Sequence, residues 1–158
     1  MNHNMQSNIN PTIIQQWLID AQKDGIQKLV VGAVIYKNNK LLLVERVPSD
    51  FMGGFVEIPS GTVEAGEDLL TALAREVQEE TGLIVTSVLE YLGSFDYRSS
   101  SGKKTRHFNF LVEVKDGEIK LNPTEHQAYY LVMLSDAVFT TLNISDATKE
   151  ILKIASQQ

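Results

Sequence analysis

The chain has 158 residues and a mass of 17.6 kDa, which is the size of a single domain. Its hydrophobic fraction of 43% and charged fraction of 22% argue against a disordered chain, a fibre or a membrane protein. The formal net charge of −6 gives no general attraction to a long nucleic acid or an anionic membrane, so we expect neither as a partner. The absence of cysteine excludes disulfides, zinc–thiolate sites and cysteine nucleophiles.

The beginning of the chain is polar and rich in asparagine over residues 1–10, without the apolar core of a signal peptide. The longest apolar runs, such as residues 29–35, are too short to span a bilayer. We therefore expect a cytoplasmic protein.

An amphipathic helix is predicted over residues 11–24, within an N-terminal segment (residues 1–27) that precedes a main domain at residues 28–158. Asn10 and Pro11 form a helix start, and apolar residues then recur at helical spacing. We expect this helix to pack on its own domain. The alternative is packing on a second subunit, which would make the protein a homodimer.

The main domain begins with two predicted strands, residues 29–36 and 41–47, joined by a turn at Asn38 and Asn39. A long structured loop follows over residues 48–66, and a short strand is expected inside it at residues 55–58. The next helix is predicted over residues 68–81, with Gly82 as its C-cap.

The remainder of the chain is predicted to be mainly strands and one final helix. The expected strands are residues 83–97, 104–114, 118–121 and 128–133, with a hairpin tip at 99–102, a short helix or turn at 135–142 and a helix from 145 to about 155. This order fits one α+β domain with a mixed sheet.

Three carboxylates share one face of the helix at residues 68–81. Glu76, Glu79 and Glu80 stand at positions i, i+3 and i+4, where like charges destabilise a helix. They also lie late in the helix, where its dipole disfavours anions. A solvated acidic face is the simplest explanation, but oxygen ligands grouped in this way also suit a hard divalent cation such as Mg²⁺ or Mn²⁺.

The wider spacing around these residues resembles the Nudix box of the Nudix hydrolases. Gly61 is followed after five residues by Glu67, and then after seven by Arg75-Glu76-Val77-Gln78-Glu79-Glu80-Thr81-Gly82-Leu83, a match at every specified position. The resemblance implies an α/β/α sandwich with a mixed sheet, plus the extra N-terminal helix. It also implies Mg²⁺- or Mn²⁺-dependent hydrolysis of a nucleoside diphosphate linked to another group.

The same resemblance implies roles for the matching residues. Glu76, Glu79 and Glu80 are the expected metal ligands, together with the backbone of Gly61, and one of the glutamates could instead act as a general base. Arg75 is expected to pair with Glu79 and orient it. We expect a structural role for Glu67 at the start of the helix and for Gly82 at its end.

Residues outside the box are expected to select the substrate. Arg106 and Asn109, in the basic hairpin of residues 97–110, are candidates for contacting it, and so is Phe55, which stands where tryptophan is common in the family. Glu125 is a candidate for binding metal or activating water. Each of these residues also has an ordinary structural explanation.

The substrate expected by elimination is a nucleoside triphosphate, giving a nucleoside monophosphate and pyrophosphate. The absence of proline between Pro59 and Pro123 argues against the ADP-ribose hydrolases of the family. The alternatives left open are an NDP-sugar or ADP-ribose type pyrophosphatase, processing of an RNA 5′ end, and a non-catalytic module that senses a nucleotide. The box keeps all its carboxylates, which disfavours the last of these.

Overall fold

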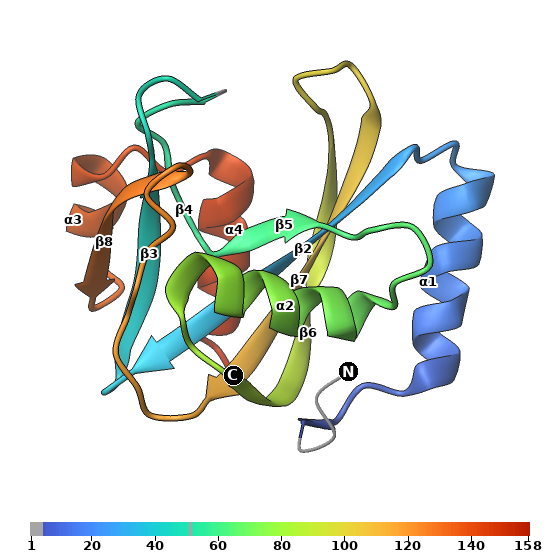
Figure 1. Ribbon diagram of the computed structural model, residues 1–158, viewed down its shortest axis with the longest axis horizontal. Coiled ribbons are helices and arrows are strands. Elements are labelled where there is room, and N and C mark those ends of the chain that lie inside the picture. Colours follow the sequence, from blue (N-terminus) through green and yellow to red (C-terminus); the bar gives the residue numbers. More distant parts are fainter. Residues whose placement is uncertain (1–4, 51) are drawn as a thin grey trace.

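The computed structural model describes residues 5–50 and 52–158. Its elements in chain order are β1 (Gln6–Ser7), α1 (Pro11–Lys23), β2 (Lys28–Lys37), β3 (Lys40–Arg46), β4 (Val56–Glu57), β5 (Ser60–Thr62), α2 (Leu69–Thr81), β6 (Val85–Arg98), β7 (Lys104–Val114), β8 (His126–Val132), α3 (Asp136–Thr141) and α4 (Asp146–Ala155) (Figure 1).

The strands form a mixed sheet. Eight strands of the described residues are connected in the order β1-β6-β7-β2-β3-β4, with β5 also paired to β2 and β8 to β3. β2 runs parallel to β7 and β1 parallel to β6, whereas the other pairs are antiparallel. The predicted α+β class and mixed sheet are therefore confirmed.

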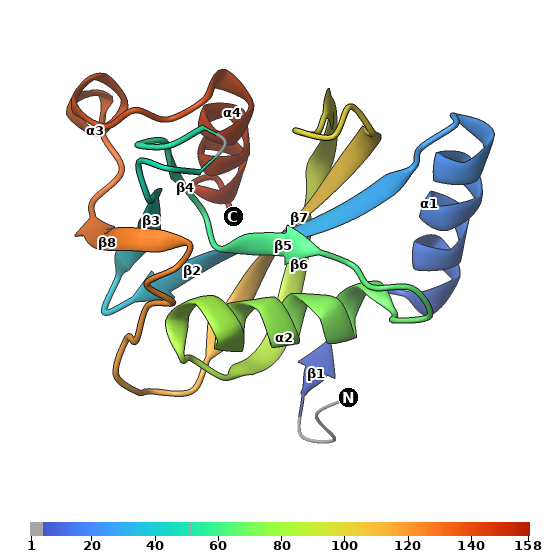
Figure 2. The same ribbon diagram turned by 45° about the horizontal axis from the view of Figure 1, so that its top comes forward.

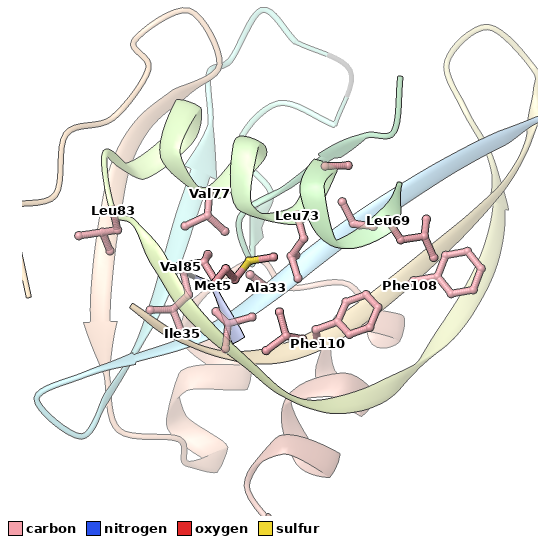
Figure 3. Close-up of a cluster of buried hydrophobic side chains, with 14 of the residues drawn as sticks. Met5, Ala33, Ile35, Leu69, Leu73, Val77, Leu83, Val85, Phe108 and Phe110 are labelled. Atoms are coloured by element: carbon pink, nitrogen blue, oxygen red, sulfur yellow. The ribbon is translucent and has the colours of Figure 1, made fainter. Parts of the chain in front are cut away.

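Helices cover both faces of this sheet, as in the predicted sandwich. Figure 2 shows α2 and α4 on opposite sides of β2 and β5. Because side chains alternate along a strand, Val31, Ala33 and Ile35 pack in the cluster beneath α2, whereas Val34 packs with α4. Figure 3 shows the first cluster, in which Leu69, Leu73 and Val77 of α2 lie over Phe108 and Phe110 of β7. The first buried cluster fixes the position of α2 on the sheet, and the second holds α4 on the opposite face.

The N-terminal helix packs on its own domain, as expected. The ring of Trp17 packs against Tyr91, with centroids 4.1 Å apart, and stacks on Phe108 at 5.8 Å. Asn10 caps the helix by accepting from the Thr12 amide. The chain before it contributes a short strand, β1, and the buried side chain of Met5, neither of which the polar composition of this segment indicated.

The predicted turn at Asn38 and Asn39 and the predicted C-cap at Gly82 are present, and Asp68, expected as the first helical residue, is the N-cap. Asn38 and Asn39 both have positive φ, at 53° and 64°, in the turn between β2 and β3. Asp68 caps α2 through the Thr71 amide, and Gly82 ends the helix in the left-handed conformation, at φ 74°.

The strand predicted over residues 118–121 is wrong. This segment runs irregularly past the end of α2, where the Lys120 amide donates to the Thr81 carbonyl at 2.7 Å. The backbone there satisfies the last turn of the helix instead of joining a strand. The described part of the chain contains no helix long and apolar enough to cross a membrane.

Candidate active site

The C-terminal half of α2 directs carboxylates at the segment that contains β5. The Ser60 amide donates to Oε2 of Glu80 at 2.9 Å, and a Cβ built on Gly61 would overlap the carboxyl group of Glu76. Glu80 is buried, at 4% exposure, whereas the side chain of Glu79 is 55% exposed. The three glutamates of the acidic face therefore differ in exposure, from the buried Glu80 to the exposed Glu79.

Arg75 joins the start of α2 to this acidic face. Its guanidinium donates to both oxygens of Glu67, at 2.7 and 2.8 Å, and to the Thr62 carbonyl at 3.0 Å. It also donates to Glu76 at 2.9 Å and to Glu79 at 3.1 Å, so the predicted contact with Glu79 is present. The paired guanidinium lowers the pKa of Glu67 to about 2.

The segment at the start of β8 places further candidate metal ligands next to Glu80. Glu125 immediately precedes β8 and His126 begins it, and these residues meet Glu80 so that one ligand atom of each lies within 4.8 Å of the other two. Glu57 of β4 accepts from the His126 ring, with Oε2 and Nε2 3.1 Å apart. The sequence suggested Glu125 for this position, and β8 carries it there through its pairing with β3.

The electrostatics of this group favour a bound cation. Burial, together with the charges of Glu57, Glu125 and Glu76, raises the pKa of Glu80 to about 10. Burial also raises the pKa of Glu76, against the opposing effect of Arg75. The carboxylates therefore need a positive charge nearby if they are to ionise together at neutral pH.

The described donors fit a hard divalent ion. Carboxylate oxygens dominate the set, and the imidazole of His126 is a nitrogen ligand that Mn²⁺ also accepts. The group is therefore suited to Mg²⁺ or Mn²⁺, the ions expected from the sequence.

The candidates outside the box lie in different surroundings. Arg106 is on the face of β7 opposite Asn109, where it pairs with Asp96 at 2.8 Å and Asp24 at 2.9 Å. Its guanidinium thus ties the end of α1 to the hairpin. Phe55 is half-buried in the loop before β4, with its carbonyl accepting from the Arg46 amide. The roles of both residues in binding substrate stay predictions.

Sequence reasoning did not identify Glu57 or His107. Glu57 stands between the buried residues Val56 and Ile58, and it pairs with Arg46 at 2.9 Å as well as with His126. A charged residue between two apolar ones in a short strand was the available signal. His107 stands between Arg106 and buried Phe108 in the predicted basic hairpin, so its neighbours in sequence do not indicate that it is buried.

Comparison with known proteins agrees with this geometry. The NUDIX domain family matches residues 27–153. Over 65% of the chain, 38% of residues are identical to an ADP-ribose pyrophosphatase of Methanocaldococcus jannaschii, of which the match covers 60%, less than two thirds. Over 63% of the chain, 36% are identical to a CTP pyrophosphohydrolase of Escherichia coli K12, 70% of which is covered.

The fold has solved counterparts as well. The MutT protein of Methanosarcina mazei Go1 superimposes with a TM-score of 0.71 at 23% identity, over 85% of this chain and 96% of that one. With the complete box on α2 and the family match over most of its length, this chain belongs to the Nudix family.

Proposed function

We propose that the chain is a divalent-cation-dependent pyrophosphohydrolase that cleaves the diphosphate bond of a nucleoside diphosphate linked to another group. The observation that carries the proposal is the meeting of Glu80, Glu125 and His126 beside Glu76 and Glu57. Such a concentration of acidic groups around the buried Glu80 favours a bound cation, because a positive charge compensates their mutual repulsion.

The acidic centre is the group of Glu57, Glu76, Glu80, Glu125 and His126, with Glu79 next to it on α2. Its residues have different roles in the proposed reaction. Glu76, Glu79, Glu80 and Glu125 would hold the cation, whose charge would neutralise phosphate oxygens and acidify an attacking water. Arg75 holds Glu76 and Glu79 in place through its paired hydrogen bonds. One of Glu76, Glu79 and Glu125 accepts the proton of the water. Glu79 is the most exposed of the box glutamates in α2, which favours its contact with substrate.

A nucleoside triphosphate is the substrate that we favour, with nucleoside monophosphate and pyrophosphate as products. The relative named CTP pyrophosphohydrolase supports this choice. The relative named ADP-ribose pyrophosphatase supports the alternative, an NDP-sugar or ADP-ribose type of substrate, despite the missing proline after the box.

The test is product release from a panel of nucleoside triphosphates, NDP-sugars, ADP-ribose and dinucleoside polyphosphates, with Mg²⁺, with Mn²⁺ and with EDTA. We expect metal-dependent turnover of one class. Glu79→Gln and Glu80→Gln should each lower kcat by about 100-fold or more with the fold intact. Glu118→Gln, at an exposed position away from the acidic centre, is the matched control, and its kcat should equal that of the wild type.

Two outcomes would contradict the proposal. Turnover that persists in EDTA, or in Glu80→Gln, would remove the acidic centre from the reaction. No turnover of any substrate by folded protein would favour the non-catalytic nucleotide-sensing module.

A further inference from the structure

A pair of unsatisfied polar atoms lies on the β7 strand, on the face of the sheet that α4 covers. Nε2 of His107 and Oδ1 of Asn109 are buried without a hydrogen-bond partner among the described residues. His107 is 8% exposed and Asn109 is fully buried. Leaving such groups unpaired costs about 1–3 kcal/mol each, so their retention calls for a ligand or a role.

The orientation of the Asn109 amide is set by the backbone. Its Nδ2 donates to the carbonyls of Gly93 and His107, both at 3.1 Å. The amide oxygen is therefore the free end, and it is an acceptor. The His107 ring is neutral at physiological pH because burial lowers its pKa to about 4, so its Nε2 either donates or accepts.

The residues beside Asn109 on both flanking strands are glycines, and the side chain of Ile58 closes the space above, with its Cδ1 3.0 Å from the position of a Cβ on Gly32. The neighbours of Asn109 in register are Gly32 on β2 and Gly93 on β6, strands that flank β7 in Figure 1. A Cβ built on Gly32 would lie 2.5 Å from Nε2 of His107 and 3.1 Å from Oδ1 of Asn109. Both unpaired atoms thus converge over one glycine.

An aromatic surface leads to this pair. The ring of Phe95 lies 4.6 Å from the His107 ring, and Tyr97 lies 6.0 Å from Phe95. Phe95 is half-buried and Tyr97 is 36% exposed, so both rings offer a face for stacking.

The pair also lies near the acidic centre. Glu57 and Arg46 both act electrostatically on the His107 ring and on Tyr97. The charge of Glu57 also acts on Glu80, and its carboxylate forms a hydrogen bond with His126. A group attached to phosphates at the acidic centre would therefore lie within reach of the aromatic surface.

We propose that His107 and Asn109 recognise the nucleobase of the substrate, which stacks on Phe95 and Tyr97 and presents an N–H donor to Oδ1 of Asn109 with a second polar atom toward Nε2 of His107. This inference rests on the proposed function, because it assumes a nucleotide at the acidic centre. A base edge supplies a donor next to a second polar atom on a flat ring, which matches the two unpaired atoms and the stacking surface.

The test measures binding, so that it does not depend on turnover. Calorimetry with Mg²⁺ compares ADP, GDP, CDP and UDP with base-free ribose 5-diphosphate on the wild type, His107→Phe, His107→Gln and Thr105→Val. His107→Phe keeps a ring of similar shape against Phe95 but removes both nitrogens. Thr105→Val is the matched control, because Thr105 is buried on the same face of β7 with its hydroxyl already bonded to the Lys103 carbonyl.

We expect the wild type to bind one nucleotide at least tenfold more tightly than ribose 5-diphosphate. His107→Phe should remove about tenfold of that preference, with ribose 5-diphosphate binding unchanged within about twofold. His107→Gln, which retains a polar group, should recover part of the preference, and Thr105→Val should keep all of it. Circular dichroism verifies that each variant is folded.

Equal binding of ribose 5-diphosphate and every nucleotide by the wild type would overturn the inference. So would a loss in His107→Phe that is the same for the base-free ligand, or an unchanged preference, because an internal water would then be the partner of the two atoms. If base-dependent binding is found without hydrolysis of any substrate, the proposed reaction fails and the base recognition stands.

Discussion

Gly61 is the residue at which the site has least room for a side chain. Its backbone lies against the Glu76 carboxyl group, and its φ is not positive, so alanine at this position meets a steric problem and no backbone strain. We expect Gly61→Ala to displace Glu76, to weaken Mg²⁺ binding and to lower kcat by about tenfold or more.

The control for this substitution is Gly117→Ala. Gly117 also has no positive φ, and a Cβ there would meet its nearest atom at 3.8 Å. It should retain wild-type activity and metal affinity. Metal titration and steady-state kinetics of the two variants decide the matter. Equal kcat and equal metal affinity of the two variants would show that Glu76 can be displaced without loss of activity or metal binding.

His107 makes the stability of the protein sensitive to acid. Its pKa is about 4 in the folded state and near 6.5 when exposed, so the unfolded chain binds more protons between these values. The stability contributed by the neutral ring is therefore complete above pH 6.5 and is lost as the pH falls toward 4, by up to about 3 kcal/mol.

Denaturant unfolding of the wild type and His107→Phe at pH 7 and pH 4.5 measures this effect. The wild type should lose more stability than the variant over that interval. Parallel losses in the two proteins would show that other groups account for the acid sensitivity.

The residues of the centre that sequence reasoning missed depend on contacts distant in sequence. Glu76, Glu79 and Glu80 belong to one helix, so their spacing alone places them together. Glu57 reaches the centre only because β4 and β8 both pair with β3, and strand order of this kind is not written in any local pattern. The unpaired atoms Nε2 of His107 and Oδ1 of Asn109 likewise depend on which strands flank β7.

Among the elements, α2 is the one that the sequence predicted most completely. Its apolar stripe and its final glycine are local signals, and both are present in the structure, where Asp68 also caps the helix. The segment at residues 118–121 has the composition of a strand, but the open carbonyls at the end of α2 compete for its backbone. The β1 strand had no alternating pattern and exists through its pairing with β6.

Arg75, in the middle of α2, holds the helix against the preceding loop through two hydrogen bonds to the Glu67 carboxylate. A lysine has one point charge and does not reproduce the paired geometry. We expect Arg75→Lys to lower the free energy of unfolding by about 1–2 kcal/mol and to reduce kcat, because Glu76 and Glu79 also lose a shared donor.

Thermal unfolding and kinetics of Arg75→Lys test this prediction, with Arg98→Lys as the control. Arg98 is exposed and donates only to the Gly102 carbonyl within the described hairpin tip. A drop in kcat equal to that of the control would limit Arg75 to a role in folding.

The exposed surface of α1 carries apolar residues that could form a contact between two copies of the protein. Ile13 and Ile19 are 48% and 46% exposed on this helix, although Trp17 faces the domain. The homodimer suggested by the amphipathic sequence stays a prediction. Light scattering of the full chain tests this alternative: a dimer that Ile13→Ser dissociates would support it, and a monomer at all concentrations would contradict it.

The same helix stabilises the domain from the side opposite its exposed residues. Trp17 packs against Tyr91 of β6 and against Phe108 and Phe110 of β7. Trp17→Ala should therefore lower the free energy of unfolding by about 2–3 kcal/mol, whereas Ile13→Ala, at an exposed site, should change it by about 0.5 kcal/mol or less. Denaturant titration compares the two. Since Trp17 lies on the face of β7 opposite His107, nucleotide binding should be retained in both variants, and its loss in Trp17→Ala alone would mean that α1 also shapes the site.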